Sequence, residues 1–132
     1  MSRIQKATLL IAGFALAGIG AATLLAPESF HSTNGIDLGG DSSLLSEARA
    51  AGGALLSLGV LIMAGAFVAR LTFTSSLSGA LVHLSYAFAR LLSLVLDGRP
   101  ATGLILAAAV ELLLGLACVA VLRRTAPAGA GA

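Results

Sequence analysis

The chain has 132 residues, which allows one domain, and its composition differs from that of a water-soluble protein. Hydrophobic residues make up 58% and charged residues 11%, against about 25% charged in soluble domains, so lipid must cover most of the surface. The net charge is +2 and the basic residues are not interleaved with aromatic ones, which argues against nucleic-acid binding. The single cysteine, Cys118, excludes an intrachain disulfide.

Four apolar stretches predict membrane-spanning helices, over residues 7–26, 48–69, 77–96 and 102–122. Each has about 20 residues, the length that a helix needs to cross about 30 Å of hydrocarbon. Arg3 and Lys6 give the first stretch the basic start of a signal peptide, but it is longer than the apolar region of such peptides and Pro27 directly follows it. We therefore interpret it as a retained helix.

The longest connection, residues 27–46, carries the turn signals Asn34-Gly35 and Gly39-Gly40. Asp41 is placed to cap the helix that follows. Asp37 and Asp41 are too few for a calcium site, so we expect them to serve turns and caps.

Two charged residues, Glu47 and Arg49, lie at the start of the second span. Residues two apart do not share a helix face, so only one of them is expected to point into the protein. A face of small residues follows along the helix, made of Ala50, Gly53, Ala54 and Ser57. Glu47 lies closer to this face, and we expect it to point inward and reach Arg90.

The third span carries polar residues at spacings of 3, 4, 3 and 4, namely His83, Tyr86, Arg90, Ser93 and Asp97. This rhythm places all of them on one helix face. An ionisable residue inside a span is costly, and it is a functional hypothesis by default. The stripe therefore predicts a polar interior between the helices.

Glu111 lies near the centre of the fourth span, about 13 Å from its first residue at 1.5 Å per residue. Counted from the same side of the membrane, Arg90 lies at a depth of about 9 Å and Tyr86 at about 15 Å. We therefore predict an ion pair between Glu111 and Arg90, completed by the Tyr86 hydroxyl. Small residues share the face of Glu111, namely Ala107, Ala108, Gly115 and Cys118.

Each of these residues also has a purely structural interpretation. Buried charge networks often fix helix register without doing chemistry, and that interpretation has about equal weight for Glu47, Arg90 and Glu111. His83 is more typical of a packing residue than of a ligand, because His31 is the only other histidine and lies in the loop. Motifs of metalloproteases, serine hydrolases, thiol-redox proteins and P-loop proteins are absent. We assign no catalytic residue, no metal site and no cofactor.

The placement of Lys and Arg predicts the orientation. With the N-terminus inside, five basic residues lie on the cytoplasmic side and two on the other. The sequence thus predicts an all-α integral membrane four-helix bundle with both termini in the cytoplasm. We expect one domain over residues 1–125 and a flexible tail over residues 126–132.

The segment Ser46-Glu47-x-Arg49-Ala50-x-Gly52-Gly53, followed by Tyr86-x-x-x-Arg90, Asp97-Gly98 and a lone Glu111, resembles the small bacterial four-helix membrane proteins of the DoxX-like group. The resemblance covers about residues 7–122. It implies a four-helix bundle in a bacterial cytoplasmic membrane, and it supplies no activity.

Three functions remain open from the sequence. The first is a non-enzymatic binding or interaction protein, either an accessory subunit of a larger membrane complex or a binder of a lipophilic ligand. The second is an enzyme that uses Glu111, Tyr86 and His83 for acid/base chemistry on a lipid-soluble substrate. The third is a proton or ion pathway through Glu111, Arg90 and Glu47. The partners expected are the bilayer, larger membrane subunits or further copies of the chain, and a lipophilic small molecule.

Overall fold

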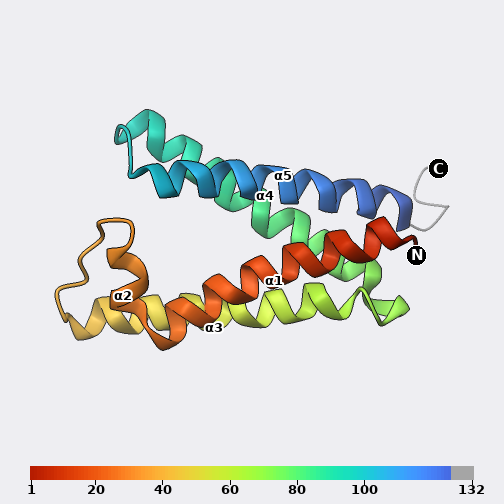
Figure 1. The fold of residues 1–132 in the computed structure, drawn as a ribbon, viewed down its shortest axis with the longest axis horizontal. Helices are drawn as coiled ribbons and strands as arrows, with labels where there is room; N and C mark the ends of the chain where they lie inside the picture. Colours follow the sequence, from red (N-terminus) through yellow and green to blue (C-terminus); the bar gives the residue numbers. More distant parts are fainter. Residues whose placement is uncertain (126–132) are drawn as a thin grey trace.

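The computed structural model describes residues 1–125, and all the regular secondary structure in them is helical (Figure 1). The predicted tail, residues 126–132, lies outside the described residues. The elements in chain order are α1 (Arg3–Leu25), α2 (Pro27–Ser32), α3 (Ser42–Ala64), a 3-10 turn η1 (Ala69–Leu71), α4 (Thr72–Leu96) and α5 (Thr102–Thr125). Four segments, those of α1, α3, α4 with its preceding turn and α5, are long and apolar enough to cross a membrane. Their number agrees with the four apolar helices predicted from the sequence, by length and composition, within residues 1–125.

The helices pack as two pairs, α1 with α3 and α4 with α5 (Figure 1). The pairs meet at the end of the molecule that holds the N-terminus, the end of α5 and the turn between α3 and α4. They diverge toward the opposite end, where α2 and the turn between α4 and α5 lie. We call the first the basic end, for Arg3, Lys6, Arg70, Arg123 and Arg124, and the second the loop end.

Side-chain caps explain where α1 and α3 begin. Asp41 accepts hydrogen bonds from the backbone nitrogens of Ser43 and Leu44, at 2.8 and 3.0 Å, which confirms the predicted cap of α3. Helix α1 begins before residue 7 because Ser2 and Gln5 form a reciprocal capping box.

Helix α3 ends at Ala64 and not at residue 69 as predicted. Side chains from the start of α4 bind the carbonyl oxygens of its last turns. Thr72 Oγ1 donates to the Gly65 oxygen at 3.0 Å and Ser75 Oγ to the Leu61 oxygen at 2.7 Å. The chain can therefore turn while these backbone groups stay satisfied.

Two glycine pairs bring the backbones of α1 and α3 into direct contact. Gly13 faces Gly59, and Gly20 faces Gly52. A methyl group on Gly52 would lie 2.6 Å from the backbone nitrogen of Leu24 and 2.8 Å from the Gly20 oxygen. The glycines are seven residues apart on each helix, which matches the repeat of left-handed helix packing.

The α4–α5 pair is held by side chains. Gly79 of α4 leaves room for the Cys118 sulfur, and Gly115 of α5 leaves room for Leu84. Cys118 is fully buried, as expected for a small packing residue. The shared core lies where the two pairs meet, and its buried members are Leu9, Ala12, Leu16, Leu55, Ile62, Ala66, Ala80 and Cys118.

Candidate functional site

An ion pair links the two helices of the α4–α5 pair. Arg90 Nε donates to Glu111 Oε2 at 2.9 Å, with the two side chains 28% and 9% exposed. The predicted Arg90–Glu111 pair is therefore confirmed. Within an apolar span, each charge provides the partner that the other requires, and the pair as a whole is neutral.

Tyr86 contacts the arginine rather than the carboxylate. Its ring centroid lies 5.8 Å from Arg90 Cζ, within the range of a cation–π interaction. No hydrogen bond joins the Tyr86 hydroxyl to Glu111 within residues 1–125, so this part of the prediction is wrong. The half-buried ring packs against the core and helps to hold the guanidinium in place.

His83 connects the two helix pairs. Its Nε2 donates to the carbonyl oxygen of Ala12 on α1 at 3.2 Å, and the side chain is 3% exposed. Because a carbonyl only accepts, this bond places the proton on Nε2 and leaves Nδ1 with a lone pair. Nδ1 is buried and has no partner within the described chain. The geometry agrees with the interpretation of His83 as a packing residue.

The outer part of the polar stripe does not face the interior. Ser93 and Asp97 are both exposed, and Ser93 Oγ donates to Asp97 Oδ2 at 2.8 Å. The prediction placed both residues in a polar interior together with the rest of the stripe. Every residue from Leu91 to Arg99 is exposed, so the last turns of α4 are not covered by other parts of the described chain. The two helix pairs diverge toward this loop end (Figure 1).

Glu47 does not point into the protein, contrary to the prediction. Both Glu47 and Arg49 are exposed, and Arg49 Nη1 donates to the carbonyl oxygen of Leu24 at the end of α1, at 2.5 Å. A cation at a helix C-terminus is favoured by the helix dipole. The face of α3 that packs is Gly52, Leu55, Gly59 and Ile62, not the small face chosen from the sequence.

A pocket of about 260 Å³ lies between α4 and α5 on the loop-end side of the ion pair. Its lining is apolar apart from Arg90, and includes Leu91, Leu94, Pro100, Leu104, Ile105 and Ala108. An arginine has five N–H donors, and Glu111 accepts from Nε alone. The arrangement can therefore offer hydrogen-bond donors to a molecule in an otherwise apolar site.

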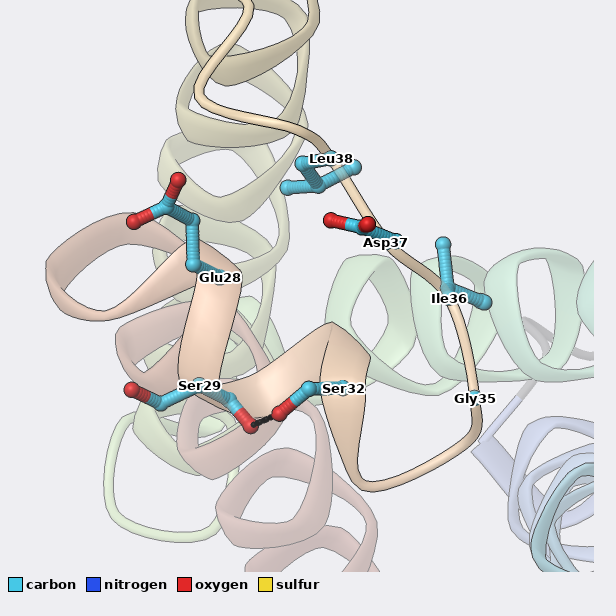
Figure 2. Close-up of a pocket in the computed structure, with 7 residues that line it drawn as sticks. All are labelled: Glu28, Ser29, Ser32, Gly35, Ile36, Asp37 and Leu38. Carbon is cyan, nitrogen blue, oxygen red and sulfur yellow. Dashed lines mark hydrogen bonds between the residues drawn. The ribbon is translucent and has the colours of Figure 1, made fainter.

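A second hollow, of about 470 Å³, lies outside the spans (Figure 2). Glu28, Ser29 and Ser32 of α2 line one side of it and residues 35–38 the other. Two of its polar side chains serve local structure: Asp37 Oδ1 accepts from the Gly39 nitrogen at 2.8 Å, and Ser32 Oγ donates to the Ser29 oxygen at 2.9 Å. This confirms the turn role predicted for Asp37, and no cluster of three metal-ligating side chains occurs within residues 1–125.

Comparison with known proteins gives a family. A family described as Domain of unknown function (DUF4345) matches residues 4–122, which include all four long helices apart from Arg3 of α1 and residues 123–125 of α5. The chain belongs to this family. No protein with a curated description and no solved structure matches it.

In this DUF4345 protein, sequence reasoning missed the residues that join α1 to α3 and the apolar residues that surround Arg90 in the pocket. The glycine pairs did have a signal, because Gly13 and Gly20 repeat at the same spacing as Gly52 and Gly59. The pocket had none, because its apolar residues look like any other part of a span.

Proposed function

We propose that this protein is a non-enzymatic membrane protein that binds a lipid-soluble molecule between α4 and α5. The observation that carries the proposal is the pocket beside the Arg90–Glu111 pair. Its volume of about 260 Å³ is just below the range of drug-sized sites, which suits a ring system or part of a longer lipid. An apolar lining with one polar group that fixes orientation is typical of small-molecule sites.

The charge state of the pocket indicates the chemistry of the ligand. Glu111 neutralises Arg90, so a charged group would gain little from the pair and would lose its hydration. The remaining N–H groups of Arg90 favour an oxygen acceptor, such as a carbonyl, ether or hydroxyl. The expected ligand is therefore neutral, mainly apolar, and carries an oxygen that accepts a hydrogen bond from Arg90.

The ligand would enter sideways from the lipid. Two residues of the pocket wall, Leu91 and Leu94, are 43% and 37% exposed and so would face the acyl chains. Arg90 lies about 9 Å from the end of α4 by helical rise, within the hydrocarbon region of a spanning helix.

The surrounding membrane is also part of the proposal. The five basic residues at the basic end favour a cytoplasmic location for both termini. The resemblance to DoxX-like proteins, and with it a bacterial cytoplasmic membrane, stays a prediction. An accessory subunit, an enzyme and a proton pathway are the competing functions, and only the first would place larger chains against this protein.

Native mass spectrometry of the protein released gently from its own membrane tests the proposal. We expect the single chain, or an assembly of its own copies, to carry an added small molecule that is soluble in lipid. The Ala108→Phe variant should fill the pocket and lower the retained amount at least fivefold. Val110→Phe is the matched control, because Val110 is exposed on the same helix and does not line the pocket.

Circular dichroism of both variants checks that they fold. Attachment of larger chains with no small molecule would contradict the proposal and favour an accessory subunit. Equal retention by the two folded variants would place the ligand elsewhere.

A further inference from the structure

Charge is distributed very unevenly between the two ends of the molecule. The basic end carries five Lys or Arg residues, and all six acidic residues of the chain lie elsewhere. Five of these belong to the loop end, namely Glu28, Asp37, Asp41, Glu47 and Asp97, and Glu111 lies within a span. The basic end therefore presents uncompensated positive charge at the level where lipid phosphates lie.

A groove runs from this charged end into the spanning region. It lies between the first turns of α1 and the last turns of α5 and has a volume of about 210 Å³. Ile4, Thr8, Ala117, Ala120 and Val121 line it, with Gln5 and Arg124. From Ala117 to Arg124 the helix rises about 10 Å. The apolar side of the groove is therefore long enough to contact several carbon atoms of an acyl chain below the guanidinium.

Arg124 and Gln5 also line an adjoining hollow of about 340 Å³ on the other side. Gln5 is only 9% exposed, and its Oε1 accepts from the Ser2 nitrogen at 2.6 Å. This bond fixes the orientation of the amide and leaves its N–H groups as donors beside Arg124. Of the five basic residues, only Arg124 lines these two spaces within the described chain. Both spaces lie between the first residues of the chain and the last turns of α5, which are neighbours at the basic end (Figure 1).

We propose that this groove is a binding site for one anionic phospholipid. Arg124 and the Gln5 amide would bind the phosphate oxygens, and an acyl chain would follow the apolar lining toward Thr8. Arg3, Lys6, Arg70 and Arg123 add long-range attraction without touching the headgroup. The site is separate from the pocket at Arg90 and has the opposite ligand preference, anionic rather than neutral.

The test uses the full chain in detergent with added phosphatidylglycerol or phosphatidylcholine, followed by native mass spectrometry. We expect the wild type to retain the anionic lipid at least fivefold better than the zwitterionic one. Arg124→Gln should remove most of this preference. Arg123→Gln is the matched control, because it removes the same charge from the next residue, which is also exposed and lines neither space.

Equal losses in the two variants would overturn the proposal, since they would mean diffuse attraction by the whole basic end. The proposal would also be overturned if the wild type retained the anionic and the zwitterionic lipid equally well. Inorganic phosphate at millimolar concentration should not displace the lipid, and displacement would mean that the site recognises free phosphate instead. Ala120→Phe, which leaves every charge in place but obstructs the groove, should also lower retention, so the outcome does not depend on Arg124→Gln folding normally.

Discussion

The two helix pairs of this protein solve the same packing problem in different ways. Backbone contact at the Gly13–Gly59 and Gly20–Gly52 pairs joins α1 to α3, and no space remains between them there. Side chains join α4 to α5, through the Arg90–Glu111 ion pair and through Cys118 against Gly79. The second arrangement leaves a pocket beside the ion pair. The comparison shows that the backbones of α1 and α3 touch at the glycine pairs, whereas the side chains between α4 and α5 leave a space beside the ion pair.

The difference follows from what drives association in lipid. Apolar side chains gain little from leaving acyl chains, so helices associate through van der Waals contact of small residues or through polar bonds. The α1–α3 pair associates through contact of small residues, and the α4–α5 pair associates through a polar bond. The following variants test whether this division is real.

The largest effect is expected from Glu111→Gln, because it leaves Arg90 without its ionic partner. Loss of one member of a buried pair costs about 3–5 kcal/mol, and the partial exposure of Arg90 favours the lower value. Thermal unfolding in detergent measures this loss of stability. The double variant Arg90→Leu/Glu111→Leu should recover much of the loss, and a double variant less stable than either single one would show that the pair does not act as described.

An effect of intermediate size is expected from Gly52→Ala in the α1–α3 pair. It should lower the free energy of unfolding by about 1–3 kcal/mol, because the methyl group would overlap the backbone of α1. Gly53→Ala provides the control, since a methyl group there has nothing within 4 Å. It should leave stability unchanged or raise it by up to about 1 kcal/mol through helix propensity. Denaturation in the same detergent compares the free energy of unfolding of the two variants. Equal losses of stability would contradict the backbone contact at Gly52.

The smallest effect is expected from Ser93→Ala, at the loop end of α4. The Ser93–Asp97 hydrogen bond is exposed, so its loss should change the unfolding free energy by less than about 0.5 kcal/mol. The same denaturation measurement checks this. A loss above about 1 kcal/mol would mean that the helix pairs close over this residue in the membrane.

The sequence correctly predicted the contact that follows from the depth of two residues in the membrane. Its predictions were wrong where the orientation of a side chain depends on packing between helices far apart in the sequence. Arg90 and Glu111 could be paired because two charges at similar depth in neighbouring spans have few other partners. The inward face of α3 could not be chosen from the sequence, because Gly52 and Gly53 are adjacent and point in different directions. Glu47 was assigned to the face of Gly53, whereas the face of Gly52 is the one that packs. The exposure of Ser93 and Asp97 depends on whether distant helices cover the last turns of α4, and no local pattern in the sequence encodes that.

The contact between α1 and α3 also makes the peptide link between them dispensable. The two glycine pairs lie inside the spans, and the bond from Arg49 to Leu24 holds the helices together beside the loop. A chain cut near Gly39 and Gly40 should therefore stay assembled, and two fragments made separately in one cell should find each other in the membrane. The loop is thus a natural place to insert a tag or a reporter domain without disturbing either of the two proposed binding sites.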